Sequence, residues 1–247
     1  MTDWILVDTP SVIYYSYYAA GLQDCLPLFL KVITNIRNQC VSDNMAFCFD
    51  SRKLKRKELY EQYKVRKKEN EDKEKIYKLI GYVKSKLLQS LGFQNIFEQE
   101  GYEADDIIAS IIHQYEKLRF VIVSNDSDMY QLLSDNVIMY NCKSRKFISS
   151  VAVKDKFGIG PENWALAVAI SGCKSDNVHG IDGIGIKTAC QYLSGSLRSY
   201  TKKKLIEDNH KKIIRNYRLV RLPYPGVKKI ILRQDKINWR RLEAVGE

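Results

Sequence analysis

The sequence has little that points to a membrane or to a zinc-binding framework. No hydrophobic run approaches the roughly 18 residues that a membrane-spanning helix needs, so we expect no membrane association. The first apolar stretch contains Asp3 and Asp8, which is unlike a signal peptide. The six cysteines form no CxxC pair and no zinc-ligand spacing, so we expect reduced, buried thiols in a cytoplasmic protein.

Motifs for nucleophilic or nucleotide-driven catalysis are also missing. The three histidines, His113, His179 and His210, are scattered, and no Ser/His/Asp triad or Cys/His pair is apparent. The segment GIDGIGIKTA has the glycines of a phosphate-binding loop, but Ile186 separates its last glycine from the lysine. The Gly-Lys-Thr adjacency of an NTPase is therefore absent.

Positive charge, in contrast, is abundant. The chain has 40 Lys and Arg against 29 Asp and Glu, which gives a net charge of +11 and an isoelectric point near 9.2. Such a surplus attracts polyanions over long distances, and nucleic acid is the polyanion that a protein without membrane segments is expected to meet.

Acidic residues gather at the ends of apolar runs. ILVD ends at Asp8, AFCFD ends at Asp50, and FVIVSNDSD ends in Asp126 and Asp128. Apolar strands alternate with helical patterns, which predicts a three-layer α/β fold with a mostly parallel sheet. Ligand sites in such sheets lie beyond the carboxyl ends of the strands, so we expect these carboxylates to converge there.

A second acidic group opens a helix in GYEADDIIASII, at Glu103, Asp105 and Asp106. Each acidic position also has a plain structural explanation: a helix cap for Asp8, the helix dipole for this second group, and an Asx turn after the third strand. Together they indicate divalent cations, which prefer oxygen ligands. Two ions about 4 Å apart can stabilise the attacking and leaving oxygens of a phosphoryl displacement.

Residues 51–90 change character abruptly. Between residues 52 and 78 there are twelve Lys or Arg and six Asp or Glu, and no Pro or Gly, so a helix is plausible but lacks an apolar face wide enough for a core. Tyr60 and Tyr63 lie among these cations, a combination that suits a nucleic-acid single strand through stacking and charge. The alternative is a solvated or disordered charged segment.

The rest of the chain is expected to be helical after a short β pair formed by NVIMYN and KFISSV. Within residues 151–220, the glycine segment suits a helix–hairpin–helix contact to a phosphate backbone, with Gly183, Gly185, Lys187 and Thr188 facing the phosphates. A tight turn between two helices is the alternative. An acidic metal site within a basic protein indicates metal-dependent cleavage of nucleic acid, so we expect one nuclease domain over residues 1–247.

These segments resemble the flap endonuclease-like 5′-nucleases, which include bacteriophage 5′→3′ exonucleases and the 5′-nuclease domain of bacterial DNA polymerase I. The resemblance covers most of residues 4–195, and the matching segments follow the family's order: ILVDTPSVIYYSYYA, AFCFDSRKLKRKELYEQYKVRKK, GYEADDIIASI, VIVSNDSDMYQLL and SGCKSDNVHGIDGIGIKTA. It implies a PIN-like α/β core, two divalent-metal sites, a basic helical arch over 51–90 and a helix-three-turn-helix element.

The resemblance also assigns roles to single residues. It places Asp8, Asp50, Glu103, Asp105 and Asp106 at or near the first metal, Asp126 and Asp128 between the metals, and Asp176 at the second. Lys64 matches the arch lysine that contacts the scissile phosphate, and Arg66 matches a nearby basic partner. The Gly183–Lys187 hairpin would hold the duplex, with K⁺ bound there in relatives.

One departure from the family pattern concerns the second metal. Many relatives read GDxxDN where this chain reads GCKSDN, so Cys173 replaces an aspartate. A thiol is a poor ligand for Mg²⁺. We therefore expect a second site that is weak, that prefers Mn²⁺, or that fills only when DNA supplies phosphate oxygens.

The predicted function is a Mg²⁺-dependent structure-specific 5′-nuclease, with Mn²⁺ as a substitute, that acts as a 5′→3′ exonuclease and flap endonuclease in replication or repair. Its expected partners are DNA with 5′ single-strand/duplex junctions and RNA–DNA hybrids. We expect a monomer that cooperates with a separate polymerase in the cytoplasm of a bacterium or a phage-infected host. The alternatives are a DNA-binding relative without cleavage, a PIN-type ribonuclease and, third, a small-molecule phosphatase.

Overall fold

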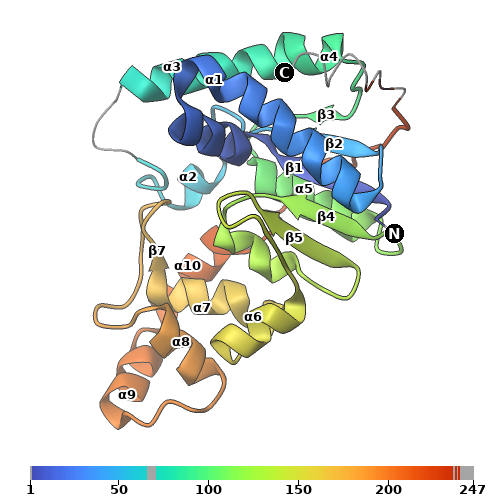
Figure 1. Ribbon diagram of the computed structural model, residues 1–247. Coiled ribbons are helices and arrows are strands. Elements are labelled where there is room, and N and C mark those ends of the chain that lie inside the picture. The colour runs from blue at the N-terminus through green and yellow to red at the C-terminus, as the bar shows by residue number, and fades with distance from the viewer. Residues whose placement is uncertain (1, 66–70, 236, 238, 240–247) are drawn as a thin grey trace.

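A six-stranded, mostly parallel sheet forms the centre of the computed structural model, which describes residues 2–65, 71–235, 237 and 239 (Figure 1). The strand order is β3-β2-β1-β4-β5-β6, and only β6 runs antiparallel to its neighbour. The strands are β1 (Trp4–Asp8), β2 (Met45–Cys48), β3 (Ile96–Phe97), β4 (Phe120–Val123), β5 (Val137–Asn141) and β6 (Lys146–Ile148). The predicted α/β architecture and the antiparallel pair at its edge are confirmed.

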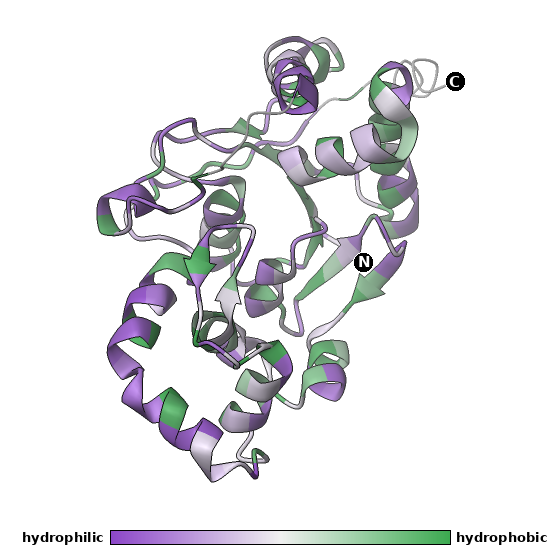
Figure 2. Cartoon of the chain, turned by 90° about the vertical axis from the view of Figure 1, so that its left-hand side faces the viewer, coloured by the Kyte–Doolittle hydropathy of each residue, from purple (hydrophilic) through white to green (hydrophobic). Residues whose placement is uncertain are grey.

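Helices cover both faces of the sheet, which is why β1, β2 and β4 are continuous apolar runs rather than alternating ones. On β1, Ile5 and Val7 point into the core under α1 (Thr9–Cys40), whereas Leu6 points into the core under α5 (Ala104–Gln114). This alternation follows from the two-residue period of a strand. Figure 2 shows the result, with hydrophobic residues on the central strands and hydrophilic residues along the outer helices.

The first helix is one element with a bend. It runs from Thr9 to Cys40 across a kink at Gly21, whose φ of 79° lies in the left-handed region that glycine tolerates best. Asp8 caps this helix, because its side chain accepts a hydrogen bond from the backbone N–H of Ser11 at 3.2 Å. The strand-terminal carboxylate is therefore anchored at a helix start.

The basic segment 51–90 is not one helix. A single turn, α2 (Arg56–Leu59), ends where Tyr60 turns extended, and the chain resumes as α3 (Glu71–Tyr82), a π-helical turn over Val83–Leu87 and α4 (Leu88–Ser90). We expected no apolar face wide enough for a core between residues 52 and 78, and of the described residues there Ile76 alone is buried in the core under α1. Val83 and Leu87, which follow that charged run, are buried in the same core.

The C-terminal half is mostly helical, as predicted, and lies below the sheet in Figure 1. The mostly buried α7 packs against α8 and α10, with the two-stranded hairpin of β7 and β8 at its end. The elements are α6 (Ser150–Phe157), a 3-10 turn (Pro161–Asn163), α7 (Trp164–Ser171), β7 (Gly172–Cys173), β8 (Val178–His179), α8 (Ile186–Leu193), α9 (Tyr200–Asp208) and α10 (His210–Val220).

After α10 the chain runs back along the sheet without regular structure, held by side chains that bond its backbone. Gln99 forms two such bonds with Lys228, at 2.8 and 3.0 Å, and Asn95 forms two with Arg233, at 2.6 and 2.8 Å. Because amide side chains carry both a donor and an acceptor, they can replace a neighbouring strand. Among the described residues, no helix is long and apolar enough to cross a bilayer.

Candidate metal centre

Four aspartates follow three parallel strands and therefore meet at one edge of the sheet. Asp8 ends β1, Asp50 comes two residues after β2, and Asp126 and Asp128 follow β4. Parallel strands end on the same side, so the topology brings these carboxylates together. Burial, followed by the charges of Asp50 and Asp126, raises the pKa of Asp8 to about 7.

Asp8 is held in place on both sides. One carboxylate oxygen caps α1, and the other accepts a 2.6 Å hydrogen bond from the hydroxyl of Ser124, at the end of β4. Asp50 is exposed and accepts a 2.9 Å bond from the N–H of Ala104, at the start of α5. The Asp50 contact joins the end of β2 to the helix that carries the second acidic group.

The acidic residues at the start of α5 form a capping box. Glu103 is the N-cap residue, and its N–H donates to Asp106 at 3.1 Å. The capping box gives Glu103 and Asp106 a structural role that is separate from the helix-dipole explanation that we weighed. Asp105 accepts the N–H of Asp106 at 2.8 Å, and burial together with the charges of Glu103 and Asp106 raises the pKa of Asp105 well above the usual range. A cation beside Asp105 would relieve that repulsion.

Two positively charged side chains of the basic segment contact this acidic group. Arg56, only 2% exposed, donates to Glu103 at 2.8 Å, to Asp106 at 2.7 Å through its second nitrogen, and to the carbonyl of Leu219 at 2.7 Å. Lys64 forms an ion pair with Glu103. Burial favours the neutral form of Glu103, but Lys64 and Arg56 outweigh it and lower the pKa of Glu103.

The sequence did not identify Arg56 as a site residue. It is one of twelve cations in a run without hydrophobic periodicity, and nothing in that run distinguishes a buried arginine from its exposed neighbours. The other predicted basic residue, Arg66, lies outside the described residues.

The second group of potential ligands combines Asp128, Cys173 and Asp176. Asp126 forms the Asx turn that we considered, because its side chain accepts the N–H of Asp128 at 2.9 Å. Asp126 therefore caps a 3-10 helix (Ser127–Leu132) that contains Asp128, and the two aspartates do not lie on an extended strand. Asp128 is buried nonetheless, and burial, Asp126 and Asp176 raise its pKa well above the usual range.

Lys64 connects the two groups. Its ammonium pairs with Glu103 of the first group and lies 3.5 Å from the carboxylate of Asp176 in the second. Its N–H also donates to the carbonyl of Asp176 at 2.9 Å, and its φ of 51° is in the left-handed region. The predicted phosphate-contacting lysine is therefore at the centre of the acidic cluster. In Figure 1 the loop after α2 lies directly above β7.

Within each group, the three ligand atoms lie within 4.8 Å of one another: Glu103, Asp105 and Asp106 in the first, Asp128, Cys173 and Asp176 in the second. In the first group Arg56 pairs with both Glu103 and Asp106, and among the described residues Asp105 is the member without an ion pair. All three members, and nearby Asp50, offer carboxylate oxygens. Carboxylate oxygens of this kind fit Mg²⁺, which takes few protein ligands and keeps several waters.

The two tyrosines that we expected to stack on the bases of a nucleic-acid single strand differ in their burial. Tyr63 is 2% exposed and its hydroxyl donates to Glu103 at 2.8 Å, so its ring is not available to a base here, and the stacking expectation is wrong for this conformation. Tyr60 is half-buried, and the guanidinium of Arg215, from α10, lies 4.8 Å from its ring centre. Tyr63 instead supports the acidic cluster.

The glycine hairpin lies apart from the carboxylates, below β7 in Figure 1. Gly183 has a φ of 77° and Gly185 is the N-cap of α8, which has no side-chain cap. Both glycines and Lys187 are exposed, and Thr188 is half-buried. A helix start with exposed N–H groups and an adjacent lysine suits a phosphate.

Comparisons with known proteins agree with this geometry. A sequence model of the 5′-3′ exonuclease, N-terminal resolvase-like domain, matches residues 3–158. The 5′-3′ exonuclease of Buchnera aphidicola subsp. Acyrthosiphon pisum is 32% identical over 199 residues, covering 75% of this chain and 68% of that protein. DNA polymerase I of Rhizobium leguminosarum is 38% identical over 169 residues, covering 66% of this chain and 16% of that protein.

Solved structures show the same fold. T5 5′-exonuclease with bound divalent metal ions (zinc) has a TM-score of 0.77 at 20% identity, with 90% of each chain covered. The catalytic core of Rad2 in complex with DNA substrate has a TM-score of 0.61 at 14% identity, covering 98% of this chain and 85% of that one. With its fold in common with these nucleases and a family match over more than half of its length, the chain belongs to the 5′-3′ exonuclease family.

Proposed function

We propose that this protein is a divalent-metal-dependent 5′-nuclease that hydrolyses phosphodiester bonds near single-strand/duplex junctions. The observation that carries the proposal is the pair of ligand groups, each within 4.8 Å, that lie on either side of Lys64. Buried carboxylates with raised pKa values repel one another, and a site of this kind is stabilised by cations.

Mg²⁺ is the proposed ion at Glu103, Asp105 and Asp50, because their donors are all oxygen. Such ions lower the pKa of a water and stabilise charge on phosphate oxygens. The residues of the chain provide the rest: the carboxylates fix the geometry, and the ammonium of Lys64 is placed to contact a phosphate oxygen and stabilise its negative charge.

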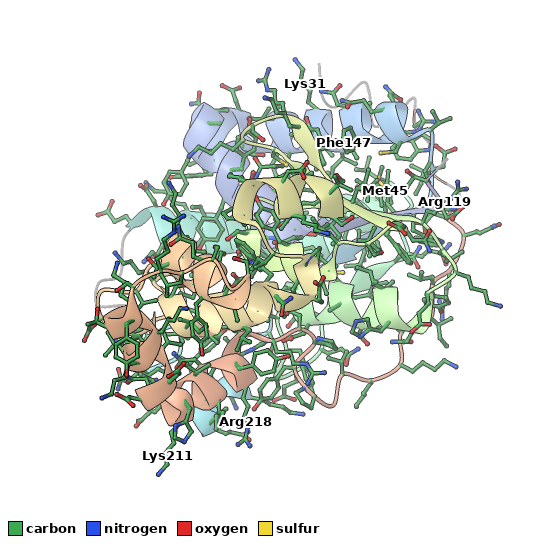
Figure 3. All side chains as sticks on the ribbon, turned by 90° about the horizontal axis from the view of Figure 1, so that it is seen from below. Lys31, Met45, Arg119, Phe147, Lys211 and Arg218 are labelled. Carbon is green, nitrogen blue, oxygen red and sulfur yellow. The ribbon has the colours of Figure 1, made fainter. Side chains whose placement is uncertain are left out.

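Substrate binding is proposed for two regions outside the acidic cluster. The Gly183–Lys187 hairpin presents N–H groups to a duplex phosphate, and K⁺ is proposed to bind there. Cations of α10 extend this surface: Figure 3 shows Lys211 and Arg218 projecting at the same end of the molecule. Residues 51–90 would receive the 5′ single strand, with Tyr60 and exposed cations as contacts.

The proposed substrates are DNA with 5′ single-strand/duplex junctions and RNA–DNA hybrids. We further propose that the protein acts as a monomer in the cytoplasm, beside a polymerase on a separate chain. These points rest on the resemblance of the motifs and on the charge of the surface.

The test is cleavage of a 5′-labelled DNA flap with titrated Mg²⁺, using Asp128→Ala as the matched control. Junction-specific cleavage by the wild type that is lost in the control, with flap binding retained, supports the proposal. Full activity of Asp128→Ala would show that the site assignment is wrong.

The alternative is a DNA-binding relative that does not cleave, and Cys173 at the second ligand group is the observation that favours it. Tight flap binding without cleavage in Mg²⁺ or Mn²⁺ would establish that alternative. Matched DNA and RNA flaps in the same assay separate a DNA nuclease from a ribonuclease.

A further inference from the structure

The β7–β8 hairpin holds a cysteine and an aspartate against the 3-10 helix that carries Asp128. Cys173 is on β7 and Asp176 is in the turn, so both face the same buried carboxylate. The hairpin closes so tightly that a Cβ on residue 180 would lie 2.1 Å from the backbone of Ser171, so only a glycine fits at Gly180.

Contacts with the basic segment fix the turn of this hairpin. The backbone N–H of Lys64 donates to the carbonyl of Asp176 at 2.9 Å, and the amide of Asn177 donates to the carbonyl of Gln62 at 2.9 Å. These two bonds hold the turn beside Asp128, in addition to the Lys64 ammonium 3.5 Å from the Asp176 carboxylate.

Asp128 has no strong hydrogen-bond donor among the described residues. It is 8% exposed, yet the one side chain that reaches its carboxylate is the thiol of Cys173, with a sulfur–oxygen distance of 3.9 Å. A buried carboxylate normally has charge-assisted donors, and one without them is costly. Its oxygens point into the space that it shares with Cys173 and Asp176.

The dimensions of this space suit one ion. The sulfur and the two carboxylate oxygens lie within 4.8 Å of one another. Two ligands of one tetrahedral ion, each at about 2.0–2.3 Å from it, lie about 3.3–3.8 Å apart, so side-chain rotations that bring the three atoms closer together are sufficient. Three protein ligands leave a fourth position open for water or a phosphate oxygen.

We propose that Asp128, Cys173 and Asp176 form a mixed oxygen–sulfur site that selects a thiophilic divalent cation, of the Zn²⁺, Co²⁺ and Cd²⁺ class, over Mg²⁺. The inference rests on the proposed function only in treating this group as a metal site. On binding, the S–H bond of Cys173 breaks, a metal–sulfur bond forms and the proton passes to solvent. Thiolate is a soft ligand that Mg²⁺ does not favour.

The site therefore differs from the group at the start of α5. That group offers oxygen alone, from Glu103 and Asp105, and takes a hard cation. Cys173 is the residue that sets the difference, which gives the protein two sites with different metal preferences.

The test is a titration of metal-free, reduced protein with Co²⁺, followed by near-ultraviolet absorption, where a thiolate ligand gives a charge-transfer band. Wild type and Cys40→Ser, a control at the far end of α1, should show the band at a stoichiometry of one per chain. Cys173→Ser and Cys173→Asp should lack it. Circular dichroism establishes that each variant is folded.

Binding constants, measured by calorimetry, form the second readout. Cys173→Asp should weaken Zn²⁺ binding at this site by at least about tenfold and should strengthen Mg²⁺ binding. Absence of the band in wild type, or a band that persists in Cys173→Ser, overturns the inference. Cleavage of a flap without the band would leave the proposed function standing, whereas the band without cleavage would leave this inference standing.

Discussion

Arg56 holds Asp106 through both oxygens of its carboxylate, with nitrogen–oxygen distances of 2.5 and 2.7 Å. Both side chains are almost fully buried. The backbone N–H of Tyr224 donates to the same aspartate at 2.6 Å, so Asp106 has its charge balanced without any metal ion. Of the acidic residues at the start of α5, this one joins the C-terminal segment to the core.

Arg56→Met should lower the free energy of unfolding by about 3–5 kcal/mol, because it leaves the buried charge of Asp106 without a partner. Urea unfolding measures the change. The matched control is Arg37→Ala, which breaks the partly exposed pair with Asp43 and should cost less than about 1 kcal/mol. Adding Asp106→Asn to Arg56→Met should restore part of the loss. Equal effects of the two arginine substitutions would contradict the assignment.

The sheet and its acidic edge could be predicted because they depend on local patterns. Apolar runs of four or five residues specify buried strands, and parallel pairing then brings Asp8 and Asp126 to one edge regardless of the details of packing. The burial of Arg56 and Tyr63 could not be predicted in this way. Both lie in a segment whose charge predicts exposure, and only the carboxylates of Glu103 and Asp106, about fifty residues away, make burial favourable.

The extended segment after α10 was beyond prediction for a related reason. Its order comes from the amides of Asn95 and Gln99, which are distant in sequence and replace a strand. No hydrophobic periodicity in the segment itself predicts those contacts.

The raised pKa of Asp8 gives stability a pH dependence in metal-free protein. The folded-state pKa of about 7 is above the unfolded value of about 3.9, so the folded state holds the proton more tightly and loses stability as pH rises from 4 to 7. Asp8→Asn removes this group. In the presence of a chelator, the stability of the wild type relative to Asp8→Asn should fall by on the order of 2–3 kcal/mol between pH 5 and pH 8.

Urea unfolding of both proteins at the two pH values gives this difference directly. Addition of Mg²⁺ at pH 8 should recover stability in the wild type more than in Asp8→Asn, since the ion neutralises the carboxylate. A relative stability that stays constant with pH, or that rises, would show that Asp8 is ionised in the folded protein across this range.

Lys64→Ala should affect turnover more than affinity. Lys64 lies between Glu103 and Asp176, where a scissile phosphate would approach both ligand groups, so its loss removes charge stabilisation in the transition state. We expect kcat on a flap substrate to fall about 10²-fold with a small change in Kd. Arg119→Ala, which breaks an exposed pair with Asp3 at the opposite end of β1, is the control and should leave both constants unchanged. A fall in affinity with unchanged turnover would argue for a role in binding only.

Lys187→Ala should weaken binding of duplex DNA and leave the chemistry intact. Its exposed ammonium adjoins the uncapped start of α8, where we propose that N–H groups hold a phosphate, and each lost phosphate contact lowers the salt dependence of binding. The slope of log K against log salt should decrease by about 1. Fluorescence anisotropy at several KCl concentrations, in an Asp128→Ala background that prevents cleavage, measures this slope.

Lys31 provides the control for this prediction. Figure 3 shows Lys31 at the opposite end of the molecule from Lys211, and Lys31→Ala should leave the slope unchanged. Equal slopes for wild type and Lys187→Ala would place the duplex elsewhere on the protein.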